Sequence, residues 1–219
     1  MAVRIVCLSA SNIEVNRTHS ASTHACALVR EILDEQSRDL QAEVEIVPLL
    51  DYELRPCRMC GKCFDTGQCA RDPAFNQVLA KMTAADGLFL VCPHYAPIPS
   101  KVMILLEKLE EMAFLKSCAD QNFHSSLFGK PMGIIAHGGQ PEAALPYYKT
   151  ALLEPLANAF RAVQVKVIGM NEQWPDGAAF GIKSITMPQD SLFVQIEHDW
   201  KAIRSQITPL VLNVAKAIR

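Results

Sequence analysis

The sequence predicts an α/β fold in which a parallel β-sheet is covered by helices on both faces. Short apolar runs of strand length alternate with longer amphipathic runs of helical length along most of the chain. Parallel strands need such crossover helices, and their sheets are buried on both faces. A chain of 219 residues, half of them apolar, can bury a full core. We expect one domain over residues 1–219, with a cysteine-rich insertion at about 55–72 and a loop and helix extension at about 171–219.

The strands of the predicted sheet come from five short runs. The runs at 3–8, 87–92 and 131–136 are apolar almost throughout, which is typical of strands buried on both faces. The run at 43–48 (EVEIVP) alternates polar and apolar side chains and indicates a less buried strand. A fifth strand is predicted at 163–169, and a loop rich in Gly and Pro follows it from 171 to 188.

Amphipathic runs between the strands predict the helices. Asp72 and Pro73 are suited to open a helix, because Pro is tolerated in the first turn, and Ser100 is suited to cap another. Pro155 interrupts the fourth helix, and Pro209 kinks the last one. The predicted helices span residues 23–35, 73–85, 100–116, 144–161 and 190–219.

Composition excludes several classes of partner. The formal net charge is −2 and the Lys and Arg residues form no run, so neither nucleic acid nor an anionic membrane surface is an expected partner. No apolar run approaches the roughly 20 residues that span a bilayer. The amino-terminal MAVRIVCLSA becomes polar too soon for a signal peptide, so we expect a cytoplasmic location.

Three loops that follow predicted strands could meet in one crevice, because parallel sheets bind ligands beyond the carboxyl ends of their strands. The first, at 9–23, is rich in hydroxyls and precedes a helix start, which suits a phosphate. The second (CPHYAPIPS) is stiff and carries an aromatic side chain suited to a flat ring. The third (AHGGQPE) has glycines that let a ligand approach the backbone. Taken singly, each could equally be a capping loop, a surface turn or a helix entry.

Four cysteines stand close together in CRMCGKCFDTGQC. The tight C-x2-C-x2-C spacing could wrap three thiolates around a [4Fe–4S] cluster, with the fourth closing from a short loop. Zinc also accepts four thiolates but more often uses two separated pairs, and a third interpretation is that no metal is bound. The other cysteines stand singly in apolar segments and are expected to be small buried side chains: Cys7, Cys26, Cys92 and Cys118.

These loops and the cysteine motif resemble the flavodoxin-like NAD(P)H-dependent FMN reductase superfamily, in its iron–sulfur flavoprotein branch. The resemblance covers about residues 3–170. The family's phosphate loop is similar to residues 10–13 with 22–23, although its Pro and Arg are absent, and Arg17 would replace the missing cation. Its flavin loop is similar to residues 92–100, where Pro97 replaces a Gly and removes a backbone N–H.

The resemblance implies a three-layer sandwich with strand order 2-1-3-4-5, FMN as prosthetic group and NAD(P)H as co-substrate. The flavin-binding positions that it implies are Ser9, Ser11, Arg17, Ser22 and Thr23 in the first loop, Pro93, His94, Tyr95, Ala96 and Ile98 in the second, and His137, Gly138 and Gly139 in the third. The ligands that it implies for a [4Fe–4S] cluster are Cys57, Cys60, Cys63 and Cys69. It also implies a homodimer or homotetramer in which a neighbouring subunit completes the flavin site.

The resulting hypothesis is an FMN-dependent oxidoreductase. Electrons would enter the flavin from NAD(P)H or a ferredoxin-like donor and leave through the cluster or to a small acceptor such as a quinone. Two alternatives stay open at this point: an electron carrier without substrate chemistry, and a zinc-stabilised domain without enzymatic activity.

Overall fold

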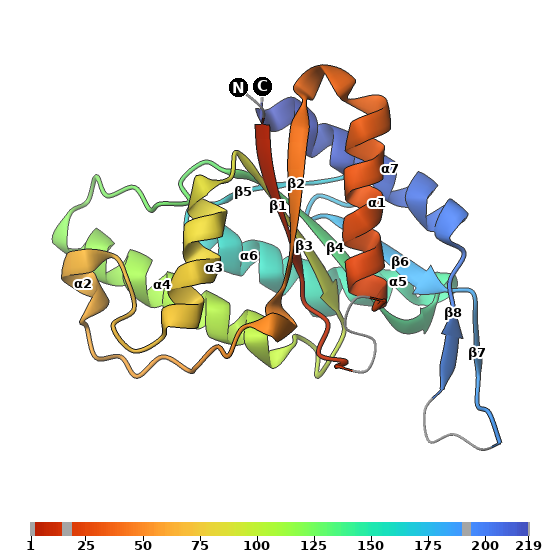
Figure 1. The fold of residues 1–219 in the computed structure, drawn as a ribbon, viewed down its shortest axis with the longest axis horizontal. Coiled ribbons are helices and arrows are strands. Elements are labelled where there is room, and N and C mark those ends of the chain that lie inside the picture. The colour runs from red at the N-terminus through yellow and green to blue at the C-terminus, as the bar shows by residue number, and fades with distance from the viewer. Residues whose placement is uncertain (1–2, 15–18, 190–193, 219) are drawn as a thin grey trace.

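A computed structural model describes residues 3–14, 19–189 and 194–218 of the chain. Its central sheet has the order β2-β1-β3-β4-β5 with every pair parallel, as predicted (Figure 1). The strands of this path are β1 (Val3–Ser9), β2 (Ala42–Pro48), β3 (Gly87–Pro93), β4 (Pro131–Pro141) and β5 (Lys166–Ile168). Their carboxyl ends lie at one edge of the sheet, which is where the polar loops begin.

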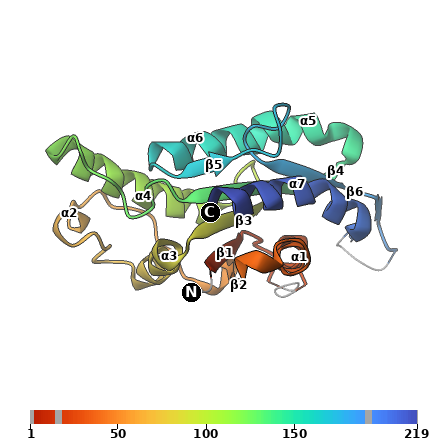
Figure 2. The same ribbon diagram turned by 90° about the horizontal axis from the view of Figure 1, so that it is seen from above.

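Helices cover both faces of this sheet (Figure 2). On one face lie α1 (Ala21–Gln36) and α7 (Trp200–Ile218), and on the other lie α3 (Pro73–Ala84), α4 (Ser100–Ala119) and α6 (Glu154–Ala162). Alternate residues of β1 serve the two faces: Ile5 packs in the α1/α7 core and Val6 in the α3/α4/α6 core. The guanidinium of Arg204 in α7 links to Glu31 and Glu35 of α1 at 3.3 and 2.6 Å. The result is a three-layer sandwich.

A sixth strand, β6 (Ala178–Ile182), lies where the sequence predicted only a loop. Strand β4 continues beyond its predicted end at residue 136, while β5 pairs only with the first three residues of β4, at 131–133. The free edge of β4 that remains is taken by β6, in parallel, beginning with Ile135 beside Ala178. Gly177 enters this strand with φ +145°, and a Cβ there would lie 2.1 Å from the carbonyl oxygen of Ile134. Only glycine fits at this position.

The last predicted helix is shorter than expected. Helix α7 begins at Trp200, and Pro209 lies inside it. Before it, β7 (Ser184–Thr186) and β8 (Gln195–Glu197) form an antiparallel hairpin that projects from the body of the protein (Figure 1). The predicted helix start at residues 190–193 falls outside the described residues.

The helix predicted at 144–161 is interrupted, as expected. Pro155 lies in the first turn of α6, and a π-helical turn (Lys149–Leu153) separates α6 from the short helix α5 (Leu145–Tyr148). The remaining short elements are α2 (Cys63–Thr66) and 3-10 turns at Arg38–Leu40, Leu49–Asp51 and Glu142–Ala144.

The single cysteines follow the prediction with one exception. Cys7, Cys26 and Cys92 are buried, whereas Cys118 is exposed because the last turns of α4 extend beyond the core. Among the described helices, none is both long and apolar enough to cross a membrane.

Candidate functional site

Two of the three predicted loops, after β1 and β3, meet at the carboxyl edge of the sheet. The third, predicted at 136–142, is instead mostly the end of β4, which runs to Pro141 because β6 pairs with it there. The backbone N–H of Ala10, after β1, donates to the carbonyl of Val91 in β3. The backbone N–H of His94, after β3, donates over 2.8 Å to the carbonyl of His137 in β4. Main-chain hydrogen bonds therefore join the loops after β1 and β3 to the strands beside them, and the polar residues of these loops lie beside those at the end of β4.

Hydroxyl groups gather where β1 faces the start of α1. The Oγ of Ser20 caps α1 by accepting from the backbone N–H of Thr23 at 3.2 Å. The hydroxyls of Ser9 and Thr23 share a hydrogen bond of 2.9 Å. Ser9, Ser20 and Ser22 are buried, so these hydroxyls have fixed positions beside the positive end of a helix.

His137, near the end of β4, is hydrogen-bonded to the start of α1. Its Nε2 shares a hydrogen bond of 2.8 Å with Oγ of Ser22, and its ring stacks on Phe180 with centroids 4.9 Å apart. Burial, helped by nearby His198, lowers the pKa of His137 to about 3. The imidazole is therefore neutral near pH 7 and holds the loops without carrying charge.

The second loop holds its aromatic side chain with its own backbone. The N–H of Tyr95 donates to the carbonyl of Pro97 at 2.7 Å, and Ala96 adopts φ +58°, which is uncommon for a residue other than glycine. Burial raises the pKa of the Tyr95 phenol, and a hydrogen bond with Ser11 acts in the opposite direction. Tyr95 is therefore a neutral, half-buried ring that links this loop to the first.

Two tyrosines that the sequence did not single out complete this edge. The hydroxyl of Tyr147 lies 3.2 Å from Nε2 of His94, and the hydroxyl of Tyr148 accepts from the backbone N–H of Gln140 at 2.9 Å. A Cβ on Gly138 would lie 2.5 Å from the hydroxyl of Tyr148, whereas a Cβ on Gly139 would meet nothing within 4 Å. Gly138 is thus required by packing, and Gly139 faces open space.

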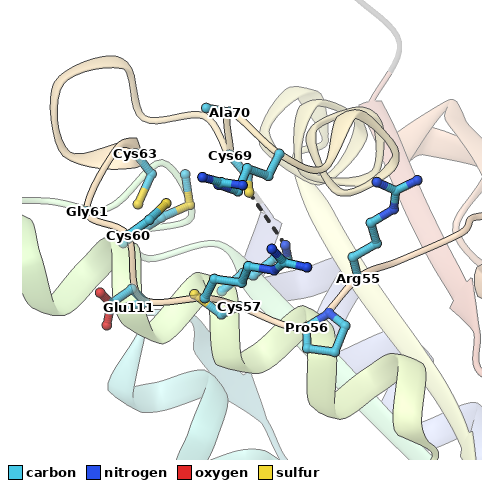
Figure 3. Close-up of a pocket in the computed structure, with 13 residues that line it drawn as sticks. Arg55, Pro56, Cys57, Cys60, Gly61, Cys63, Cys69, Ala70 and Glu111 are labelled. Atoms are coloured by element: carbon cyan, nitrogen blue, oxygen red, sulfur yellow. Dashed lines mark hydrogen bonds between the residues drawn. The ribbon is translucent and has the colours of Figure 1, made fainter.

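The four clustered cysteines line a second site, away from these loops. They surround a cavity of about 400 Å³ between the cysteine segment and α4 (Figure 3). Nζ of Lys101, at the start of α4, donates to the carbonyls of Leu49, Leu50 and Tyr52, which fixes the beginning of the segment. Further along α4, the carboxylate of Glu107 accepts from the N–H of Cys57 at 2.9 Å. The segment therefore runs along α4 and away from the sheet edge.

Four basic side chains contribute to the lining of this cavity. Arg55, Arg58, Arg71 and Lys108 all line it, with Glu111 as an acidic member. A hydrogen bond from the backbone of Lys62, and the nearby Arg71, lower the pKa of the exposed Cys60 thiol. Burial, together with the neighbouring Cys57, Cys69 and Glu111, raises the pKa of Cys63.

A buried ion pair, missed in the sequence, stands beside Cys69. Nζ of Lys108 lies 3.0 Å from Oδ2 of Asp72 and 3.5 Å from Sγ of Cys69. Although burial raises the pKa of Asp72, hydrogen bonds from the backbone of Arg55 and Phe75 and from Lys108 lower it on balance. A lysine in a helix is normally expected to be exposed. Because its partner, Asp72, is distant in sequence, no local pattern indicates this ion pair.

The four thiols surround the cavity without converging on one point. Within the described parts of the chain, no three His, Cys, Asp or Glu side chains are arranged to hold a single metal ion. The donor set, four thiols facing one space, is chemically suited to a metal group larger than a single ion, and the basic side chains beside it would offset the negative charge of the thiolates.

A family model described as NADPH-dependent FMN reductase matches residues 3–174. The chain belongs to this family. An iron-sulfur flavoprotein of Methanocaldococcus jannaschii is 32% identical over 82 residues, which cover 37% of this chain and 42% of that protein. The match thus spans less than half the length of this curated relative.

Solved structures show that this FMN reductase family member has the flavodoxin-like fold. A crystal structure of RosB with the bound intermediate 8-demethyl-8-formylriboflavin-5′-phosphate has a TM-score of 0.62 at 16% identity, over 100% of this chain and 79% of that one. A Fusobacterium nucleatum flavodoxin mutant bound to flavin mononucleotide has a TM-score of 0.52 at 11% identity, over 100% of this chain and 97% of that one. The fold implied by the sequence resemblance is confirmed.

The predicted flavin residues of this family member fall into three groups. Ser9, Ser11, Ser22, Thr23, His94, Tyr95, His137, Gly138 and Gly139 lie together at the carboxyl edge. Pro93 is the buried last residue of β3, while Ala96 and Ile98 belong to the same loop as Tyr95: Ala96 is exposed and Ile98 packs against the core. Arg17 lies outside the described residues.

Proposed function

We propose that this protein is an NAD(P)H-dependent flavin oxidoreductase whose FMN lies over the carboxyl edge of the sheet. Membership of the NADPH-dependent FMN reductase family supports both the prosthetic group and the hydride donor. The observation that carries the proposal is the role of His137, whose carbonyl and imidazole link the loop after β3 and the start of α1 to the carboxyl end of β4. Such a junction is where open parallel sheets bind ligands.

Each loop has a distinct part in this proposal. Ser9, Ser11, Ser22 and Thr23, with the N–H groups that open α1, hold the phosphate, and Arg17 adds a positive charge there. His94 and Tyr95, with Pro93, Ala96 and Ile98 as their loop, flank the flavin ring. The open space over Gly139 leaves room for the ring to approach the backbone. Bound FMN supplies the redox chemistry, while these residues bind it, orient it and exclude water.

We further propose that Cys57, Cys60, Cys63 and Cys69 hold a [4Fe–4S] cluster. A single tetrahedral zinc ion needs four thiolates about 2.3 Å from one point, whereas within the described residues no three such side chains are arranged to hold one ion. The arginines on the lining offset the negative charge that four thiolates bring. The curated relatives of this chain are themselves called iron-sulfur flavoproteins, which supports the same assignment.

The two sites are separate within one chain. The cavity meets α4 at Lys108–Met112, eight to twelve residues after its first residue, Ser100, which is a rise of about 12–18 Å along the helix. With both groups bound, electrons supplied by NAD(P)H or a ferredoxin-like protein would leave the flavin through the cluster or to a small acceptor such as a quinone. In this proposal the protein is a homodimer or homotetramer, and a neighbouring subunit completes the flavin site.

The test is anaerobic purification followed by an absorbance spectrum, iron and sulfide assays, and titration with FMN. We expect bound FMN, iron with acid-labile sulfide, and bleaching of the flavin band by NADPH or NADH. If neither nucleotide bleaches the flavin band, the result would indicate an electron carrier without substrate chemistry. Zinc without iron would make it a zinc-stabilised domain, and a colourless protein that does not bind added FMN would overturn the proposal.

A single substitution separates the two sites. Cys60→Ser removes one cluster ligand from an exposed position and should abolish nearly all cluster iron while FMN stays bound. The matched control is Cys118→Ser, an exposed cysteine outside the motif, which should change neither. Loss of FMN from Cys60→Ser would mean that the cysteine segment is part of the flavin site.

A further inference from the structure

Lys108 is a buried lysine, and its burial requires an explanation from the groups around it. Its side chain is 3% exposed and that of Asp72 is 1% exposed. Lysine is almost never fully buried unless it is paired, because removing its charge from water is costly. Its Nζ also lies 5.4 Å from the centroid of the Phe75 ring, so the side chain is packed on several sides.

Asp72 contacts two backbone N–H groups besides Lys108, and only one of these contacts could be made by a neutral side chain. Its Oδ1 accepts from the N–H of Phe75 at 2.9 Å and caps α3, and its Oδ2 accepts from the N–H of Arg55 at 2.8 Å. A neutral Asn can cap a helix as well as an Asp can, but its amide NH2 cannot accept from the Arg55 N–H. The second oxygen of Asp72 is therefore shared by the Arg55 N–H and the ammonium of Lys108, and neither contact explains why a lysine is buried here.

The remaining polar contact of Lys108 is the sulfur of Cys69. Nζ donates to Sγ at 3.5 Å, which the dashed line at Cys69 marks in Figure 3. The Cys69 backbone is fixed on both sides by Asn76, whose Oδ1 accepts from the Cys69 N–H at 2.8 Å and whose Nδ2 donates to the Cys69 carbonyl at 2.9 Å. The sulfur of Cys69 thus has a fixed position and a fixed cationic donor.

We propose that Lys108 is a positioning residue that raises the reduction potential of the cluster held by the four cysteines. The inference rests on the cluster assignment made above. Hydrogen bonds and positive charge at cluster sulfurs stabilise the reduced form, which carries one more negative charge. Burial strengthens the effect because the interaction is poorly screened. The equilibrium concerned is uptake of one electron by the cluster, and no bond to Lys108 forms or breaks.

The experiment compares reduction potentials of variants that fold. Lys108→Met alone leaves Asp72 buried without its cationic partner, so the main variant is the double substitution Asp72→Asn with Lys108→Met. It retains the helix cap and the net charge and gives up only the contact of Asp72 with the Arg55 N–H. The control is Lys81→Met, which removes a lysine from an ion pair with Glu45 at the surface of the protein. Each protein is purified anaerobically, assayed for iron, sulfide and bound FMN, and titrated with dithionite while the cluster is followed by electron paramagnetic resonance.

We expect the double variant to retain its iron and FMN while its cluster becomes at least tenfold harder to reduce, a shift of 59 mV for one electron. Lys81→Met should titrate like the wild type. An unchanged potential in an iron-loaded double variant would overturn the inference alone. A double variant that binds FMN but no iron would also overturn it, because the contact would then build the site instead of setting its potential. Wild-type protein without iron would overturn the cluster assignment, and this inference with it.

Discussion

Nε2 of His137 and Oγ of Ser22 share a hydrogen bond of 2.8 Å between residues that lie 115 positions apart. Both side chains are buried, and Ser22 lies in the first turn of α1. Because the same histidine accepts the N–H of His94 through its carbonyl, it links the end of β4 to the loop after β3 as well. This contact between the end of β4 and the start of α1 therefore helps to hold the candidate flavin site together.

Ser22→Ala tests that contact. The substitution leaves a buried imidazole nitrogen without its partner, and we expect the free energy of unfolding to fall by about 1–3 kcal/mol. Urea denaturation at about pH 7 measures it. Ser205→Ala, on the exposed side of α7, is the control and should change stability by less than about 0.5 kcal/mol. Equal effects of both variants would show that the contact is not important for stability.

Acid should destabilise the protein through His137. Its folded-state pKa of about 3 lies below the ordinary value of 6.5, so the unfolded chain binds a proton that the folded chain excludes. The contribution is constant above about pH 6.5, and between there and about pH 3 the free energy of unfolding falls by up to about 1.4 kcal/mol per pH unit.

Denaturation curves at several values between about pH 7 and pH 4 check this dependence. In His137→Gln, the free energy of unfolding should depend less steeply on pH, by the equivalent of roughly one proton. Some slope will remain, because burial and His24 also lower the pKa of His198 and because the pKa of Asp72 is lowered as well. An unchanged slope in His137→Gln would contradict the prediction.

Gly138 and Gly139 should respond differently to the same added methyl group. Gly138→Ala drives a Cβ to 2.5 Å from the Tyr148 hydroxyl, so we expect a loss of about 1–3 kcal/mol of stability. Gly139→Ala meets no protein atom within 4 Å and should leave stability nearly unchanged. It should nevertheless weaken FMN at least tenfold if the ring occupies that space. Thermal denaturation and FMN fluorescence titration separate the two effects, and unaltered FMN affinity in Gly139→Ala would place the ring elsewhere.

Asp72→Ala should be among the most destabilising single changes. It removes the cap of α3 and leaves Lys108 as a buried charge without its carboxylate, which costs about 3–5 kcal/mol. Glu45→Ala breaks the exposed pair with Lys81 and should cost less than about 1 kcal/mol. Chemical denaturation compares the two, and similar losses would contradict a charged, buried pair.

The central sheet was predictable because its strands are buried on both faces. Burial on both sides requires apolar side chains at successive positions, as in the run at 87–92, and such runs are visible without any knowledge of their partners. The interruption at Pro155 was visible for a similar reason, since proline lacks the N–H that a helix interior needs.

The parts that were missed depend on partners distant in sequence. Strand β6 has five residues, one of them Gly181. It forms because β4 extends beyond the end of β5 and leaves a free edge with which β6 pairs. Lys108 is buried beside Asp72, and His137 is hydrogen-bonded to Ser22. In both pairs the partners are distant in sequence and meet only in the folded protein. Cys118 was predicted to be buried because its neighbours are apolar, but the end of α4 passes beyond the core that would have covered it.

The place of α7 has a consequence for synthesis on the ribosome. A Cβ on Gly133 would meet Val214, and a Cβ on Gly87 would meet Ile218, so α7 lies directly against the strands. Every strand of the central sheet leaves the ribosome before α7 does. Until then, Phe89 and Ile135 on that face have no cover from it, and the nascent chain presents an apolar surface of the kind that chaperones bind. A chain whose translation stops before α7 should therefore aggregate or be degraded, even though all the loops of the candidate flavin site have already been made.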